Sequence, residues 1–139
     1  MPTVSESEPS GKRRFLALWF PYLAVERIRR AQMGPNWRKH EANLPPLVTS
    51  RREANAQRIA SGDRRAEALG LRPGTGIADA RARHPELVVE PEDNHADRHL
   101  LLTLADWCDR YTPLVGLDEP DGLFLDISGC AHLFGGEGA

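Results

Sequence analysis

Four carboxylates that could bind a metal ion lie close together in the sequence. They are Asp118, Glu119, Asp121 and Asp126. Mg²⁺ prefers oxygen ligands, and phosphoryl transfer by two metal ions needs carboxylates that hold both ions from opposing segments. The apolar segment 15–25 contains no acidic residue, so it supplies no such ligand. The four acids are therefore interpreted as an exposed turn, with Asp121 as a weak candidate for a single cation.

Arginine supplies most of the positive charge, and it is concentrated in the first part of the chain. Residues 1–85 carry 16 basic and 8 acidic side chains, whereas residues 86–139 carry 2 basic and 12 acidic ones. Arginine binds phosphate oxygens in pairs, so the basic part could contact nucleic acid; the alternative is two solvated surfaces of opposite charge. The candidates for phosphate contact are Arg51, Arg52, Arg58, Arg64, Arg65 and Arg72.

Residue spacing excludes several other kinds of site. Cys108 and Cys130 are too few for a disulfide framework, and with His132 they lack the spacing of a zinc site. No P-loop and no Ser-His-Asp order occurs. The apolar run over 15–25 is interrupted by Pro21 and is shorter than the roughly 20 residues that span a bilayer. We therefore expect a soluble, cytoplasmic protein.

Hydrophobic periodicity predicts the elements that would position these groups. A continuous apolar run predicts a strand buried on both faces over 15–20. Asp63 is a suitable N-cap, and Gly70 suits the left-handed position after a helix. The other expected segments are a helix over 23–32, a loop over 36–46, a short strand over 47–49, helices over 63–69, 77–83 and 95–111, and a strand over 87–89.

The end of the sequence predicts a β-hairpin. Extended runs over 114–117 and 123–128 flank the turn residues 118–122. Asp126 alternates with apolar neighbours and is expected to face solvent or a polar edge. Residues 1–12 are polar and are expected to form a disordered tail. The order of elements predicts an α+β fold with a sheet covered by helices.

Several segments occur in an order that resembles the N-terminal part of Y-family translesion DNA polymerases. The match continues through an ending, 130–137, that is similar to the ImuB-type members of bacterial mutagenesis cassettes, and it covers about residues 13–137. Several motifs in one order make a fairly specific signal. The matching segments before that ending are 22–26, 65–74, 78–81, 85–89 and 121–129.

The resemblance implies part of a right-hand polymerase architecture. Residues 13–22 and 87–139 would form a partial, ferredoxin-like palm sheet covered by helices, and residues 23–86 would form a small helical insert like the fingers. The thumb, the little finger and a C-terminal region with a clamp-binding segment would lie beyond residue 139. We therefore expect the sequence to be a truncated piece of a longer protein.

The resemblance also implies that the metal-binding residues are missing. In active members, an Asp of the first strand and an Asp-Glu pair of the hairpin hold the metal ions. The first position falls at Ala17, and another acidic position falls at Trp19. The pair falls at Asp121 and Gly122. Methyl, indole and hydrogen side chains cannot ligate Mg²⁺, so no intact catalytic residue set is expected.

The expected nucleotide-binding residues are also altered. Active relatives hold the triphosphate with a Tyr-x-x-Arg motif, and its two positions fall at Arg64 and Glu67. A carboxylate there would repel a triphosphate, although Arg64 and Arg65 could compensate. Tyr22 matches the aromatic residue that excludes ribonucleotides by contacting the sugar, and its alternative role is core packing beside the strand.

The resemblance predicts a catalytically inactive protein that acts as a scaffold in translesion synthesis and mutagenesis, in the SOS response to DNA damage. No cofactor is expected. The implied partners are DNA, the sliding clamp, an ImuA-type accessory protein and an error-prone polymerase. Two alternatives stay open. One is an active error-prone DNA polymerase that uses Mg²⁺ in an altered metal site, and the other is a small nucleic-acid-binding α+β domain.

Overall fold

The computed structural model of the 139-residue chain describes residues 3–7, 14–112 and 114–128. The chain divides into two compact units, and each combines a β-sheet with at least one helix. The first unit comprises Met1–Pro21 and His95–Ala139, and the second comprises Tyr22–Asn94. The expected α+β class is confirmed.

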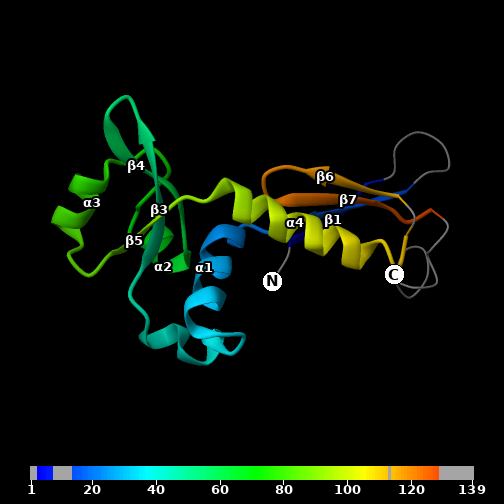
Figure 1. Ribbon diagram of the computed structural model, residues 1–139, viewed down its shortest axis with the longest axis horizontal. Coiled ribbons are helices and arrows are strands. Elements are labelled where there is room, and N and C mark those ends of the chain that lie inside the picture. Colours follow the sequence, from blue (N-terminus) through cyan, green and yellow to red (C-terminus); the bar gives the residue numbers. More distant parts are fainter. Residues whose placement is uncertain (1–2, 8–13, 113, 129–139) are drawn as a thin grey trace. The chain divides into compact units, whose positions relative to one another are not determined.

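The first unit contains a four-stranded antiparallel sheet in the order β1-β2-β7-β6. Figure 1 shows α4 (Asn94–Cys108) running along this sheet. The antiparallel pairing of β2 with β7 brings residues that are about a hundred positions apart in the sequence into one sheet. Its strands are β1 (Thr3–Ser7), β2 (Phe15–Trp19), β6 (Val115–Asp118) and β7 (Gly122–Asp126).

Alternation along the strands separates the two faces of this sheet. Leu16 pairs with Leu125 and Leu18 pairs with Leu123, so these leucines share one face. Leu123 is completely buried, as is Leu101 of α4. Because α4 is the only helix among the described residues of this unit, we infer that it covers the leucine face.

Two expectations for the first unit are wrong. Residues 3–7 form an edge strand rather than a disordered tail, because their backbone pairs with all of β2; the rest of 1–12 lies outside the described residues. Asp126 is buried rather than solvent-facing, and its Oδ1 accepts a hydrogen bond from the backbone N–H of Ser128 at 2.9 Å. A buried carboxylate needs such donors, and local turn geometry supplies one.

The second unit contains a three-stranded mixed sheet in the order β4-β3-β5. β3 pairs with β4 antiparallel and with β5 parallel. In chain order the elements are α1 (Leu23–Met33), the 3₁₀ helix η1 (Trp37–Asn43), β3 (Leu47–Glu53), β4 (Ala56–Gly62), α2 (Arg64–Ala68), α3 (Ile77–Arg83) and β5 (Val88–Pro91).

Helices pack on both faces of this second sheet. Leu47 packs with Val25 and Ile28 of α1 on one face. Its neighbour Val48 points to the other face and joins a cluster with Ala66 of α2 and with residues of α3. Successive strand residues face opposite sides, which explains why both positions are completely buried.

The insert over 23–86, which was expected to be helical, therefore also contains a sheet. The predicted boundary between this insert and the palm at residue 87 is wrong. β5 belongs to the second unit because it pairs with β3, and the unit continues to Asn94. The sequence did not predict β4, because most of its residues favour β-strands only weakly. Its hairpin with β3 turns at Ala54 and Asn55, which both have positive φ. The predicted loop over 36–46 contains η1.

Several other local predictions in the second unit are confirmed. Helix α1 begins at Leu23, and α3 spans Ile77–Arg83 as predicted. The side chain of Asp63 caps α2 by accepting a hydrogen bond from the N–H of Ala66 at 2.9 Å. Gly70 follows with a φ of 79°, the left-handed conformation expected there. No helix in the described part of the chain is long and apolar enough to span a membrane.

Candidate functional site

The structure brings the four positions that the resemblance associates with metal binding to neighbouring strands of the first unit. In the pairing of β2 with β7, Trp19 lies opposite Gly122, and Ala17 lies opposite Phe124. Asp121 immediately precedes β7, and its carbonyl oxygen accepts a hydrogen bond from the N–H of Phe20 at 2.8 Å. The strand pairing therefore places these four positions close together in one sheet, and the chemistry available there depends on their side chains.

The carboxylate of Asp121 is engaged by an indole. Nε1 of Trp19 donates a hydrogen bond to Oδ2 of Asp121 at 3.1 Å. The Trp19 side chain remains 51% exposed, so the contact lies at the surface. An N–H donor now occupies the side of the carboxylate that faces β2, where a second carboxylate would be needed to share a metal ion.

Gly122 has little space for a side chain. A Cβ atom there would lie 3.1 Å from the carbonyl oxygen of Asp118 and 3.2 Å from that of Leu18. Both atoms belong to the backbone of flanking strands, so they cannot move without shifting the sheet. Any side chain at this position, a carboxylate included, would therefore press on the two flanking strands.

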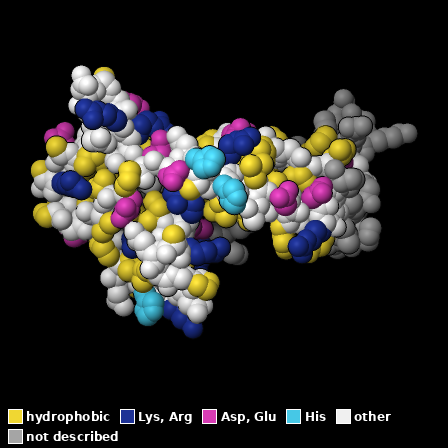
Figure 2. All heavy atoms as spheres, viewed as in Figure 1, with side chains coloured by type: hydrophobic (Ala, Val, Ile, Leu, Met, Phe, Trp, Pro, Cys, Tyr) yellow, Lys and Arg dark blue, Asp and Glu magenta, His cyan; other side chains and the backbone are white. Residues whose placement is uncertain are grey.

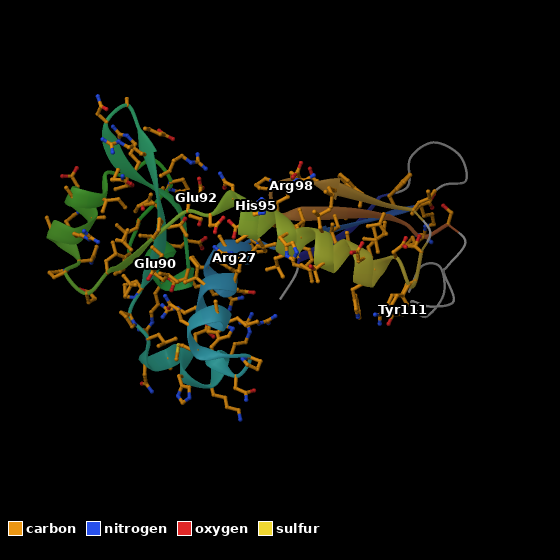
Figure 3. All side chains as sticks on the ribbon, in the orientation of Figure 1. Arg27, Glu90, Glu92, His95, Arg98 and Tyr111 are labelled. Atoms are coloured by element: carbon orange, nitrogen blue, oxygen red, sulfur yellow. The ribbon has the colours of Figure 1, made fainter. Side chains whose placement is uncertain are left out.

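The side chains at this site do not fit a two-metal centre. Ala17, Trp19 and Gly122 offer no oxygen ligand, and within the described ranges no group of three His, Cys, Asp or Glu side chains is arranged to hold a metal ion. Glu119, another acid of the turn, accepts a charge-assisted hydrogen bond from Nε of Arg98 on α4 at 2.6 Å (Figure 3 labels Arg98).

Tyr22 begins the second unit and contacts both altered triphosphate positions. Its hydroxyl donates a hydrogen bond to Oε2 of Glu67 at 2.9 Å, and the guanidinium of Arg64 lies 5.3 Å from its ring centroid. Burial and the hydrogen bond to Glu67 both raise the pKa of the Tyr22 hydroxyl. The ring also packs against the cluster that contains Val25 and Leu47. Tyr22 thus combines core packing with a polar contact to Glu67.

Four of the six candidate arginines are held by the protein itself. Arg51 forms a paired interaction with Glu92, Nε to Oε1 at 3.0 Å and Nη2 to Oε2 at 2.8 Å. This interaction raises the pKa of Arg51 and lowers the pKa of Glu92. Arg58 donates to the carbonyl of Gly74 at 2.9 Å, Arg65 donates to the carbonyls of Leu44 and Ala42, and Arg64 lies over Tyr22.

The other two arginines are available for phosphate contact. Arg52 and Arg72 are exposed, and within the described part of the chain neither guanidinium group has an ion-pair or hydrogen-bond partner. Arg52 is adjacent to Arg51 on β3 and therefore points to the opposite face of that strand. Figure 2 shows the Lys and Arg side chains of the visible face scattered and interleaved with acidic side chains, rather than gathered in one patch.

Sequence reasoning missed a buried ionic contact that supports the second unit. The guanidinium of Arg29 is almost fully buried and donates to the carbonyl of Pro45 at 2.5 Å. It also lies 3.5 Å from Oδ2 of Asp63, which accepts the N–H of Leu47 at 3.1 Å. Asp63 thereby joins α1, β3 and α2. A helix-capping signal identified Asp63, but the partner on α1 depends on tertiary packing.

A small cavity of about 40 Å³ adjoins this contact in the second unit. Tyr22, Arg29, Asp63 and Arg64 are among the side chains that line it. The volume is enough for one or a few water molecules and far below that of a nucleotide pocket. The cavity therefore gives no independent support for nucleotide binding.

Comparison with known proteins agrees with this architecture. Residues 24–139 match the impB/mucB/samB family. Protein ImuB from two strains of Caulobacter vibrioides is 54% identical over 71 residues, which is 51% of this chain and 16% of that protein. The matched part of the chain therefore spans about a sixth of the length of these relatives.

Solved structures of DNA polymerases share the fold. A binary complex of Dbh DNA polymerase superposes with a TM-score of 0.68 at 15% identity, covering 83% of this chain and 32% of that one. DinB from Sulfolobus solfataricus superposes with a TM-score of 0.65 at 14% identity, covering 85% and 32%. The chain therefore belongs to the impB/mucB/samB family, with the palm-type fold of Y-family polymerases, and its resemblance to the ImuB type is confirmed.

Proposed function

We propose that this chain is the polymerase-like part of a catalytically inactive, ImuB-type protein that acts as an adaptor in translesion synthesis and mutagenesis after DNA damage. One observation carries the proposal. At the positions where a Y-family polymerase would hold its metal ions, the side chains are those of Ala17, Trp19 and Gly122, and the remaining Asp121 accepts a hydrogen bond from Trp19. Without opposing carboxylates, the attacking and leaving oxygens have no metal ions to stabilise them, so we expect no cofactor.

The contact between Tyr22 and Glu67 supports the same proposal. Glu67 directs a carboxylate oxygen at the Tyr22 hydroxyl and places negative charge beside the position proposed for the nucleotide. A triphosphate would meet electrostatic repulsion there rather than a clamp of hydrogen-bond donors. Arg64 offers a positive charge, but it already lies over the Tyr22 ring.

The proposed partners are DNA, the sliding clamp, an ImuA-type accessory protein and an error-prone polymerase that performs the synthesis, in the cytoplasm and in the SOS response. DNA contact would use the unpartnered arginines Arg52 and Arg72 and would weaken with salt. The match to ImuB and to the polymerase fold supports the general role. The matched part covers a small share of those proteins, so surfaces for the other partners would lie largely outside it.

Primer extension by the intact protein tests the proposal. The assay uses a primed template with all four dNTPs and either Mg²⁺ or Mn²⁺, and we expect no extension above a protein-free control. Asp121→Ala and the matched control Asp106→Ala, an acid on α4, accompany the wild type. Templated incorporation that Asp121→Ala abolishes and Asp106→Ala preserves would reject the inactive assignment. Incorporation that survives both substitutions would indicate a contaminating polymerase.

A further inference from the structure

Two aromatic side chains are exposed on one face of the four-stranded sheet. Trp19 is 51% exposed and Phe124 is 44% exposed. The strand register places both on the face opposite the buried leucines, because each lies one residue away from a leucine in its own strand. They come from β2 and β7 and are diagonal neighbours in the pairing.

The neighbours of these rings are small, so the rings are left uncovered. Phe124 lies between Ala17 on β2 and Gly116 on β6. Trp19 lies opposite Gly122 on β7, and Thr3 of the edge strand β1 lies on its other side. We call this surface the aromatic face. It consists of the two rings and the small residues between and beside them: Ala17, Trp19, Gly116, Gly122 and Phe124. The hydrogen bond from the indole of Trp19 to Asp121 also restricts the orientation of one ring before any partner binds.

Negative charge borders the aromatic face. Asp118 shares the cross-strand row of Gly122 and Trp19, and Asp121 contacts the indole. Residues 95–128 carry seven acidic and two basic side chains, and Arg98 is already paired with Glu119. Carboxylates repel the phosphates of nucleic acid when no cation lies between them. The charge therefore disfavours nucleic acid and favours a partner with basic side chains.

We propose that the aromatic face is a docking surface for a polypeptide segment of another protein that presents an apolar residue flanked by Lys or Arg. The apolar residue packs between Trp19 and Phe124 over Ala17, and the basic residues approach Asp118 and Asp121. Aromatic anchors with a charged rim are typical of protein interfaces. This inference deepens the adaptor role of the proposed function and rests on it.

Panning of the intact protein against a phage-displayed library of random twelve-residue peptides tests this docking surface. We expect enriched clones in which Lys or Arg flanks an aromatic or aliphatic residue. Those clones should bind Phe124→Ser at least tenfold more weakly than wild type, and Asp118→Asn/Asp121→Asn should weaken them similarly. Leu102→Ser is the matched control, because Leu102 is an exposed leucine of α4 in the same unit and should leave binding unchanged.

Three results would overturn the inference: no enriched clones, clones that bind Phe124→Ser as well as wild type, or enriched clones without basic residues. Tight binding of a single-stranded dT20 oligonucleotide that Phe124→Ser abolishes would assign the face to nucleic acid instead. Circular dichroism of each variant checks that it folds. Primer extension is a separate measurement. Polymerase activity would reject the inactive assignment without changing the peptide result. A failed peptide experiment would likewise reject the docking surface without changing the primer-extension result.

Discussion

Trp19 and Asp121 are 102 residues apart in the sequence, yet the indole Nε1 of one donates a hydrogen bond to Oδ2 of the other at 3.1 Å. The pairing of β2 with β7 brings them together. In a metal-dependent polymerase sheet, this is where two carboxylates would face a shared cation. Here a neutral donor instead contacts the remaining carboxylate at the protein surface.

The limited space at Gly122 predicts that alanine substitutions at two glycines of the same sheet will change stability by different amounts. Gly122→Ala should lower the free energy of unfolding by about 1–3 kcal/mol, because its Cβ would press on the backbone of β6 and β2. Gly116→Ala is the matched control, since a Cβ there meets nothing within 4 Å. Urea unfolding followed by circular dichroism measures both. Equal effects of the two substitutions would contradict the argument.

The contact between Arg29 and Asp63 predicts a larger effect in the second unit. Asp63→Ala removes the cap of α2 and leaves the buried guanidinium of Arg29 without its carboxylate, so it should cost about 2–4 kcal/mol. Asp63→Asn keeps the capping oxygen and should cost less. Asp79→Ala in the first turn of α3 is the control, and about 0.5 kcal/mol or less is expected there. A similar loss for Asp79→Ala would refute the special role of Asp63.

The pair Arg51 and Glu92 predicts a pH-dependent contribution to stability. The hydrogen bond from Arg51 lowers the pKa of Glu92 below its ordinary value of 4.5, so folding favours the charged carboxylate. The contribution is therefore present above about pH 4.5 and is lost as pH falls through the lower folded value. Because Arg51 is half exposed, we expect only about 0.5–1 kcal/mol.

Urea unfolding of wild type and Glu92→Gln between pH 2 and pH 7 measures this contribution. The difference between the two proteins should be largest at neutral pH and should shrink toward zero in acid. Glu53→Gln is the control, because Glu53 is exposed and lies 3.7 Å from Nη1 of Arg51. A difference that is constant over the whole range would show that Glu92 contributes through packing rather than charge.

Some of the candidate arginines are paired within the protein and others are not. This difference predicts which of them contribute to DNA binding. Arg52→Ala and Arg72→Ala should each reduce the slope of log affinity against log salt by about 1, because their guanidinium groups are available to phosphates. Arg51→Ala should change the slope less, since Glu92 already neutralises Arg51. Fluorescence anisotropy of a labelled duplex in increasing NaCl gives the slopes. An effect of Arg51→Ala equal to that of Arg52→Ala would contradict this division.

Local features of the fold could be predicted from the sequence. The helix that begins at Leu23, the cap at Asp63, the left-handed Gly70 and the hairpin before Asp126 all depend on residues within a few positions of each other. The strands over 3–7 and 56–62 were missed. Residues 3–7 have little strand character alone, and they are ordered by pairing with β2.

The sequence by itself determined what the candidate site lacks, because a missing carboxylate at Ala17 or Gly122 is a property of residue type and needs no coordinates. Only the tertiary structure decided what replaces it: the indole of Trp19 on Asp121, the exposed ring of Phe124, and the partner of each arginine. The physical reason is that such contacts are made between segments far apart in the chain. Strand register and helix packing set their geometry, and neither is encoded in the spacing of neighbouring residues.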